Sequence, residues 1–309
     1  MSAIVGMGTA LPTGRLTNKD LEATLDTTDE WIVERTGIRE RRIAGPHDTT
    51  VSLATAAGAE AIADSGVDPT TIDLLILATL TPVQQLPASA VYVQDNLGLQ
   101  CGAFDLGAAC SGFVYGLVMA NGLVETGGAR AALVIGAEVL SDCVDPADRS
   151  TRILFGDGAA AAVIVPSAPG HGILGSDLGC DGSAAAILEI ARDEKYVTMD
   201  GKEVFRRAVR ACTQSATDAM DRAGVRAGEI DLFVPHQANT RIIDAIMERV
   251  GIDASKCAMN IADYGNTSAA SIPLALAEAK PNDGDLVLLC GFGAGMTWAS
   301  AVVRWGTGQ

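Results

Sequence analysis

The chain has few of the residues that build disulfide and metal sites. Its seven cysteines are an odd number and form no CxxC pair, a pattern that favours a reducing compartment over a disulfide framework. It has only three histidines, and no two of them are spaced as zinc ligands. We therefore predict no metal site, although cysteine ligands scattered along the sequence remain a formal alternative.

Net positive charge and long apolar runs are also missing. The formal net charge is −16, which argues against nucleic acid as a partner, although an acidic partner can still dock on a local basic patch. No apolar run reaches the roughly 20 residues that span a bilayer. The apolar N-terminal segment MSAIVGMGTALP has no basic leader before it, so no signal peptide is expected. We predict a cytoplasmic protein that binds neither nucleic acid nor a membrane.

The apolar segments that are present have the lengths of strands and helices. Continuous Val, Ile and Leu runs that alternate with Ala-rich helical segments predict an α/β protein with mostly parallel sheets, covered on both faces. The expected strands are 74–78, 132–135, 160–165, 230–234, 286–289 and 299–304. The expected helices are 53–64, 111–124, 204–223, 241–250 and 269–279.

The chain shows signs of two similar halves. The Pro- and Gly-rich segment 166–175 is the best candidate boundary, and it predicts halves 1–165 and 166–309. In each half a strand ends in a short turn of small residues that leads into a helix, at 104–110 and at 232–239. This similarity indicates an internal duplication.

Cys110 stands in the stretch FDLGAACSGFVYGL, between small residues. If 111–124 is a helix, the sulfur lies at its N-terminus, where unpaired N–H groups and the positive end of the dipole favour a thiolate. The flanking alanines and Gly112 leave room for a substrate. From this stretch alone, a packed core cysteine is an equally good interpretation.

His236 and Asn266 also stand at turns between a strand and a helix. His236, in DLFVPHQANTRII, follows the expected strand 230–234, and reactive groups gather at the carboxyl ends of strands in open α/β sheets. A histidine there can transfer a proton near neutral pH, although it could equally cap a loop. Asn266, in DYGNTSAASIPLAL, offers donors without charge, and alone it could simply be an N-cap. Together with Cys110 these residues predict one reactive site.

A glycine-rich turn, LLCGFGAGMTW, follows near the C-terminus. A dinucleotide-binding loop needs a following helix and an acidic residue about 20 positions on, but only 14 residues (309 − 295) follow Gly295. The N-terminal VGMGTALP fails as well, because Leu11 and Pro12 stand where a glycine and a helix should follow. A turn between two strands is better suited to presenting backbone N–H groups to an oxyanion.

These motifs resemble the β-ketoacyl-[acyl carrier protein] synthase III family over nearly the full length of the chain. The matching segments are DEWIVERTGIRERR, AACSGF, DRSTRILFGDGAAAAVI, VPHQANTRI, GNTSAAS and GFGAGMTW. The resemblance implies the thiolase fold, in which two duplicated halves of βαβαβαββ type form a layered α-β-α-β-α sandwich. It also implies a condensing enzyme that starts fatty-acid or polyketide synthesis.

The resemblance assigns roles to the reactive residues. Cys110 would take an acyl group from acyl-CoA, which is a substrate, and no permanently bound cofactor is implied. His236 and Asn266 would hydrogen-bond the thioester carbonyl of malonyl-ACP and stabilise the enolate formed when CO2 leaves. The backbone amides of Cys110 and Ala294 would hold the other oxyanion; the family usually has glycine at the position of Ala294.

The resemblance also implies how the substrates bind. Trp31 and Arg149 would sandwich the CoA adenine, and Arg35 would lie near its phosphates. Lys202 stands where an asparagine often contacts the pantetheine, which puts that contact in question. Leu86 falls where related enzymes place a residue of the partner subunit at the floor of the acyl pocket. Because some of them have Phe there, Leu predicts room for a longer or branched primer.

A basic landing patch for the acyl carrier protein is implied around the entrance to the site. Its arginines would be Arg241, Arg206 and Arg249, with Arg207 and Arg210 nearby. For arginines such as Arg249 a solvated helix face explains the charge equally well. A homodimer is expected from the family.

Three other interpretations remain open. A thiolase would use Cys290 as a second cysteine, but it would have Gly-His-Pro where this chain has Gly-Asn-Thr at 265–267. A secondary-metabolism starter-unit condensing enzyme or acyltransferase is the closer alternative, and the intact Asn266 argues against a pure acyltransferase. A non-catalytic scaffold is disfavoured by the complete Cys, His and Asn set.

Overall fold

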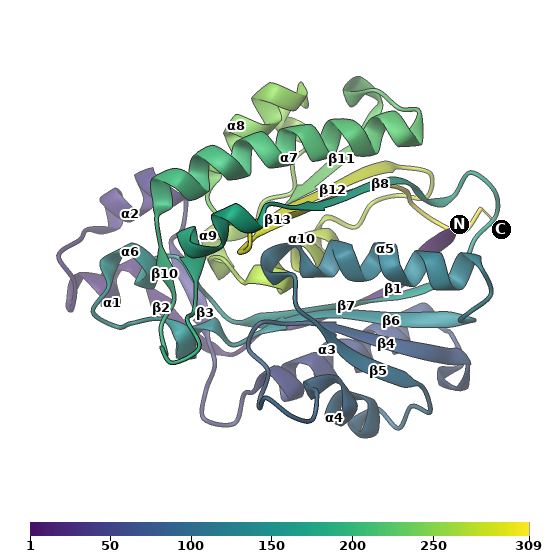
Figure 1. Cartoon of the computed structure of the whole chain (residues 1–309), viewed down its shortest axis with the longest axis horizontal. Helices are drawn as coiled ribbons and strands as arrows, with labels where there is room; N and C mark the ends of the chain where they lie inside the picture. Colours follow the sequence, from purple (N-terminus) through teal and green to yellow (C-terminus); the bar gives the residue numbers. More distant parts are fainter. Residues whose placement is uncertain (309) are drawn as a thin grey trace.

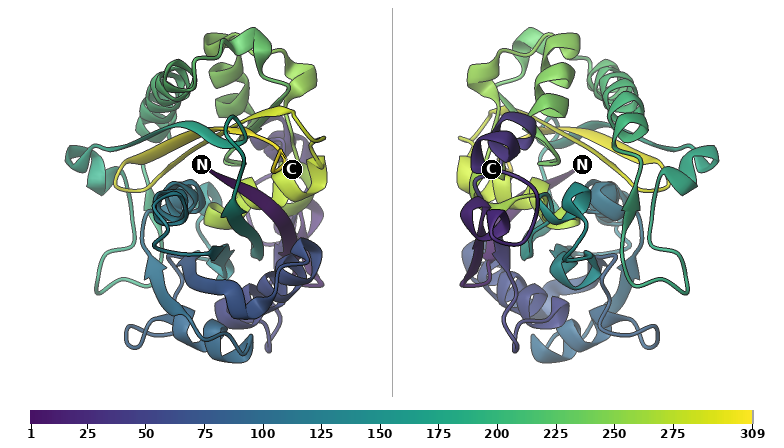
Figure 2. Two further views of the ribbon diagram at one scale, coloured as in Figure 1. Left: turned by 90° about the vertical axis from the view of Figure 1, so that its right-hand side faces the viewer. Right: turned by 90° about the vertical axis from the view of Figure 1, so that its left-hand side faces the viewer.

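The computed structural model, which describes residues 1–308, stacks two sheets and three layers of helices (Figure 1). Helices α3 and α4 cover the outer face of the first sheet, α5 and α10 lie between the sheets, and α7 and α8 cover the second sheet (Figures 1 and 2). The predicted α-β-α-β-α sandwich of the thiolase fold is confirmed. The helices of these layers are α3 (Thr50–Ser65), α4 (Ser89–Asn96), α5 (Gly112–Glu125), α7 (Gly201–Ala223), α8 (Thr240–Val250) and α10 (Ser271–Ala279).

Both sheets are mixed. Their strand orders are β1-β7-β6-β4-β5 and β11-β12-β13-β8. Strand β4 is parallel to β5 and β6, and β11 is parallel to β12, whereas the other neighbours in these two sheets are antiparallel. The strands are β1 (Ser2–Ala10), β4 (Ile72–Ala78), β5 (Gly102–Leu106), β6 (Ala131–Glu138), β7 (Gly158–Pro166), β8 (Gly172–Cys180), β11 (Leu232–Pro235), β12 (Leu286–Gly293) and β13 (Thr297–Arg304).

The expectation of mostly parallel sheets is therefore wrong. The apolar runs are continuous because helices cover both faces of each sheet, and that burial does not depend on strand direction. Each expected strand and helix nevertheless overlaps an observed one. The expected glycine turn joins β12 to the antiparallel strand β13.

Smaller elements gather at one end of the sandwich, on the left of Figure 1. They are β2 (Gly14–Thr17), α1 (Asn18–Glu22), α2 (Asp29–Thr36), β3 (Glu40–Ile43), α6 (Arg149–Arg152), β9 (Leu188–Glu189), β10 (Thr198–Met199) and α9 (Ile261–Tyr264). Among residues 1–308 no helix combines the length and the apolar character needed to cross a bilayer.

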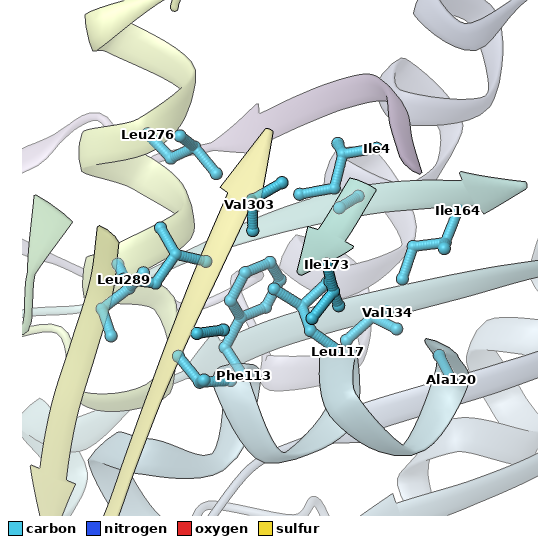
Figure 3. Packing of buried hydrophobic residues seen from close by; sticks show 14 of the residues in the cluster. Ile4, Phe113, Leu117, Ala120, Val134, Ile164, Ile173, Leu276, Leu289 and Val303 are labelled. Carbon is cyan, nitrogen blue, oxygen red and sulfur yellow. The ribbon is translucent and has the colours of Figure 1, made fainter. Parts of the chain in front are cut away.

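The central helix α5 is packed between the two sheets (Figure 3). Its side chains Phe113 and Leu117 are fully buried, and they meet Val134 of the first sheet and Leu289 of the second. Burying one such large side chain contributes roughly 1.5–3 kcal/mol. The N-terminus of α5, next to Cys110, is thus held by contacts to both sheets.

The two central helices α5 and α10 begin in the same way. Each helix follows one short 3₁₀ turn, Ala109–Ser111 before α5 and Ser268–Ala270 before α10. The first residue of each turn has a positive φ, 46° at Ala109 and 49° at Ser268. The segment 232–239 also leads from a strand into a helix, as expected, but its helix is α8 on the outer face of the second sheet. The internal duplication stays a prediction.

The chain passes from the first sheet to the second between Pro166, which ends β7, and Gly172, which begins β8. The two parts interlock, since Leu274 and Ala270 at the start of the second central helix pack against Ala160 of β7. The division into halves 1–165 and 166–309 stays a prediction.

Candidate active site

Cys110 lies in the 3₁₀ turn directly before α5, as predicted, and is 7% exposed. Strand β12 passes beside Cys110, and the positions of β12 nearest to it are glycines. A Cβ at Gly293 would lie 2.6 Å from the Cys110 nitrogen, and one at Gly291 would lie 3.5 Å from the Cys110 carbonyl oxygen. These glycines of the GFGAG motif therefore let the hairpin β12–β13 approach the cysteine turn.

The thiol of Cys110 is the resting form. Burial raises the pKa of Cys110 to about 12, and the neighbouring Ser268 side chain acts in the opposite direction without offsetting the burial. The prediction of a thiolate at the helix N-terminus is therefore wrong for the resting chain. The proton has to leave during the reaction.

His236 follows β11, where the backbone and one aromatic ring fix it. Its N–H donates to the Cys290 carbonyl (2.8 Å), and its ring meets Phe292 edge to face with centroids 5.3 Å apart. The side chain is 3% exposed, and burial lowers the pKa of His236 to about 3. The imidazole is therefore neutral near pH 7.

A buried serine selects the tautomer of His236. The Ser271 Oγ lies 2.6 Å from the imidazole Nδ1 and also accepts from the Gln237 N–H (3.4 Å). Because the serine has one proton, we assign its O–H as donor to Nδ1. This leaves the hydrogen of the neutral ring on Nε2, where the side chain can donate. Sequence reasoning missed Ser271, although it lies in the GNTSAAS segment.

Two backbone hydrogen bonds join Asn266 to the segment around Phe155. Its N–H donates to the Leu154 carbonyl (2.8 Å), and its carbonyl accepts from the Gly156 N–H (2.9 Å). The side-chain Oδ1 accepts from the Ser268 N–H (2.9 Å), so the oxygen caps the turn before α10. Among residues 1–308 no protein group accepts from the Asn266 Nδ2, which remains available as a donor.

The three reactive side chains line one cavity of about 870 Å³ that also reaches Trp31 and Arg35. Cys110 lines a second cavity of about 260 Å³ as well, which also contacts Ala294 and Ser268. The other residues around this smaller cavity are mostly apolar: Leu80, Ala109, Leu140, Phe155, Leu188, Glu189, Ile190 and Val197. Cys110 thus stands where a wide polar cavity meets a small apolar one.

Trp31 and its two arginines are in direct contact. The Arg149 guanidinium lies 4.8 Å from the Trp31 ring centroid, and that of Arg35 lies 5.1 Å from it. These are cation–π distances. A flat base can lie between Trp31 and Arg149 only after the guanidinium moves away. Lys202 lines the same large cavity.

The structure does not bring the predicted basic patch together at the cavity. Arg241 lines the large cavity and is exposed. Arg206 is paired with Glu203 (2.6 Å) and faces a separate cavity, which Arg207 and Arg210 also line. Arg249 is exposed about two turns farther along α8, away from these cavities.

Two other predicted residues lie away from the cavities of this chain. Leu86 is 84% exposed and lines neither cavity, so its place in a partner's acyl pocket stays a prediction. Cys290 is 1% exposed, and its Sγ lies 3.7 Å from the carbonyl oxygen of Cys212 in the core beneath α7. It is not placed to act as a second reactive cysteine.

A buried carboxylate next to the site was not predicted. Glu138, at the end of β6, is fully buried and accepts a hydrogen bond from the Ser268 hydroxyl (3.0 Å). The signal for it is the segment AALVIGAE, an entirely buried strand that ends in an acid. Among residues 1–308 no group of three or more His, Cys, Asp and Glu side chains is placed to hold a metal ion.

Comparisons with known proteins agree on one family. The family model of 3-oxoacyl-[acyl-carrier-protein (ACP)] synthase III matches residues 104–195, and the model of its C-terminal part matches 220–305. A β-ketoacyl-[acyl-carrier-protein] synthase III of Symbiobacterium thermophilum is 48% identical, with 98% of each chain covered.

Solved structures extend this similarity to the whole fold. The 3-oxoacyl-[acyl-carrier-protein] synthase III from Aquifex aeolicus is 45% identical, with a TM-score of 0.96 over 99% of this chain and 100% of that one. The priming β-ketosynthase from the R1128 polyketide biosynthetic pathway is 39% identical, with a TM-score of 0.94 over 100% of this chain and 97% of that one.

Proposed function

The chain belongs to the β-ketoacyl-[acyl-carrier-protein] synthase III family, and we propose that Cys110, His236 and Asn266 carry out its reaction where the two cavities meet. It is an acyltransferase that initiates fatty-acid synthesis. One observation carries the assignment of residues: Cys110 lines both cavities, and two uncharged side chains, those of His236 and Asn266, line the larger one.

In the first half of the reaction Cys110 takes the acyl group from acyl-CoA. The sulfur attacks the thioester carbonyl, and the CoA thiolate leaves through the large cavity. The amides of Cys110 and Ala294 hold the oxyanion, in keeping with the place of both residues around the small cavity. The apolar lining of that cavity suits the hydrocarbon part of the acyl group, which stays behind on the enzyme.

In the second half malonyl-ACP enters the large cavity and loses CO2. The Nε2–H of His236 and the Nδ2–H of Asn266 donate to its thioester carbonyl, where the charge of the enolate develops. Both donors are neutral and buried, so they stabilise this charge in a site of low dielectric, each by about 2.7–4 kcal/mol. The carbanion then attacks the acyl group, and Cys110 is released.

The large cavity also supports the binding assignments. Trp31, Arg35 and Arg149 would hold the nucleotide of CoA, with Arg149 moving off the indole to admit the base. Arg241 offers a positive charge at the cavity to the acidic carrier protein, and Arg206 and Arg249 would lie farther out on the same landing surface. The chain supplies the nucleophile and both donors itself, so we propose that no resident cofactor takes part.

We propose a homodimer and a cytoplasmic location. Leu86 and Val83 expose 84% and 43% of their surfaces on the loop before α4, and Tyr92 of α4 exposes 40%. The neighbouring strand β5 is an edge of its sheet, and such edges are commonly paired or covered. All seven cysteines are free, which fits a reducing compartment. Light scattering at several concentrations tests the dimer.

A starter-unit condensing enzyme of polyketide synthesis is the second candidate. The similarity to the priming β-ketosynthase of the R1128 pathway favours it. The chemistry at Cys110 is the same in both cases, so the primer and the carrier protein distinguish the two. The small Leu86 side chain supports a longer or branched primer in either pathway.

Mass spectrometry of the intact protein tests the proposed function. The chain is incubated with acetyl-, isobutyryl- and longer acyl-CoAs, and then with malonyl-ACP from fatty-acid or polyketide synthesis. We expect a mass increase equal to the acyl group, located on Cys110 by peptide mapping and reversed when β-ketoacyl-ACP forms. Cys110→Ala is the matched control. Acylation elsewhere, or none with any acyl-CoA, would contradict the proposal, and a clear acetyl preference would reject the interpretation of Leu86.

A further inference from the structure

Acyl transfer needs a base for the Cys110 proton while the sulfur attacks, and the CoA thiolate takes up a proton when it leaves. Cys110 rests as a thiol and must lose its proton when the sulfur is acylated. His236 is badly placed to accept it, because its Nδ1 receives the O–H of Ser271 and its Nε2 already carries a hydrogen. Burial also lowers the pKa of His236 to about 3, which makes the ring a poor base. Until the CoA thiolate has left, another base beside the sulfur would have to hold the proton.

Glu138 is the buried acid that the reaction described so far does not use. It accepts hydrogen bonds from the hydroxyls of Thr79 and Thr81 (3.2 and 2.7 Å) and from the amides of Leu80 and Thr81. All of these donors are neutral. Burial raises the pKa of Glu138 to about 7 despite them, so the carboxyl can exist in either protonation state near neutral pH. The titratable groups that face it are the thiols of Cys110 and Cys143.

Ser268 connects this carboxylate to the reactive sulfur. Its hydroxyl lies 3.0 Å from the Glu138 Oε1, and its side chain lines the small cavity together with Cys110. The Ser268 side chain also acts on the Cys110 thiol, whose pKa it lowers against the larger effect of burial. Ser268 has a φ of 49°, in the left-handed region that few residues other than glycine adopt. The hydrogen bond from the Ser268 N–H to the Asn266 Oδ1 fixes this unusual backbone, so that the side chain reaches Glu138 at the cavity that Cys110 also lines.

We propose that Ser268 relays the proton of Cys110 to Glu138 during acyl transfer and returns it during condensation. In the first step the S–C bond to the acyl group forms and the C–S bond to CoA breaks. The Cys110 proton moves to the Ser268 oxygen while the serine proton moves to Glu138, and the CoA thiolate takes a proton from water. In the second step the enolate attacks the acyl group, and the departing sulfur recovers the stored proton along the same path. This inference rests on the proposed function.

The rate of Cys110 acylation in a single turnover, measured against pH, tests the relay. In the unmodified chain the rate should rise with pH through about 7, as Glu138 loses its proton. Glu138→Gln should abolish this rise and slow acylation about 100-fold or more at pH 8, the size of general-base effects. Thr79→Val removes one donor from the ionised carboxylate, so it should keep the rise but move it to higher pH.

Ser268→Ala tests the path itself, because Glu138 keeps its bonds to Thr79, Leu80 and Thr81. It should lose the pH-dependent rise as completely as Glu138→Gln does. Thermal unfolding and CoA binding identify variants that fold; if Glu138→Gln does not, Ser268→Ala decides. A folded Ser268→Ala variant with the unmodified rate and pH profile would overturn the relay.

Alkylation of Cys110 by iodoacetamide measures the same proton loss without acyl-CoA. The relay predicts that the alkylation rate rises through the same pH and that both variants lose this rise. If the unmodified chain is alkylated with this profile yet accepts no acyl-CoA, the proposed function fails while the relay stands. An alkylation profile that Ser268→Ala leaves unchanged would refute the relay even for an active condensing enzyme.

Discussion

Asn266→Asp keeps the hydrogen bond that fixes the side chain and removes the hydrogen bond that we propose stabilises the enolate. The Oδ1 accepts from the Ser268 N–H, and aspartate keeps an oxygen at that position. The substitution therefore preserves the cap on the turn before α10. It replaces the Nδ2 donor by an oxygen at the place where the enolate charge develops. The side chain is 6% exposed, so water screens this charge poorly.

The expected loss is large and confined to condensation. Removing one donor of this kind costs about 2.7–4 kcal/mol, or a factor of about 10² to 10³, and the new negative charge adds repulsion. We therefore expect condensation with malonyl-ACP to slow at least about 10³-fold. Acylation of Cys110 by acyl-CoA should stay within a few-fold, because Asn266 does not contact the first oxyanion. The two steps are followed separately by quenched-flow mass spectrometry.

The pH dependence gives a second check on the same variant. The introduced carboxyl can donate a hydrogen bond only when it is protonated, so condensation should recover partly as the pH falls. Asn266→Ala, which introduces no charge, should lack this recovery and should also be less stable, because the Ser268 N–H loses its acceptor. Condensation within threefold of the unmodified rate, with acylation intact, would refute the role of the Asn266 amide.

The remaining predictions concern the neighbours of the site. Ser271→Ala frees the imidazole of His236 to place its hydrogen on Nδ1, so condensation should slow about 5- to 30-fold, equivalent to about 1–2 kcal/mol, while acylation is little changed; equal effects on both steps would contradict this tautomer. Cys290→Ser should leave condensation largely intact, because Cys290 lies in the core and lines neither cavity. A loss of activity as complete as that of Cys110→Ala would instead support the thiolase interpretation. Trp31→Ala should raise the KM for acyl-CoA at least tenfold with little change in kcat, and an unchanged KM in steady-state assays would place the nucleotide elsewhere.

Local patterns predicted many of the elements and the places of the three candidate residues. Cys110, His236 and Asn266 stand at turns between apolar runs, and each run that was expected to be a strand or helix overlaps an observed one, although β1, β8 and α4 were not among them. The directions of the strands were not predictable in this way, because a strand covered by helices on both faces has the same composition whether its neighbour is parallel or antiparallel.

Interactions between distant segments were the part that could not be predicted. The carboxyl of Glu138 meets the hydroxyl of Ser268, which is 130 positions away in the chain. Neither segment contains a sequence pattern that predicts its contact with the other. The protonation state of Cys110 was misjudged for a related reason: a helix N-terminus is visible in the sequence, whereas the degree of burial that outweighs it depends on both sheets.

The position of α5 and α10 between the sheets has a consequence for how the protein loses activity. The proposed nucleophile, Cys110, belongs to the turn before one central helix, and the proposed donor, Asn266, caps the turn before the other; both helices share one apolar interior. Heating cannot pull these groups apart while that interior remains intact. Inactivation should therefore coincide with cooperative melting of the whole molecule, and a fragment containing only one sheet should have no residual turnover.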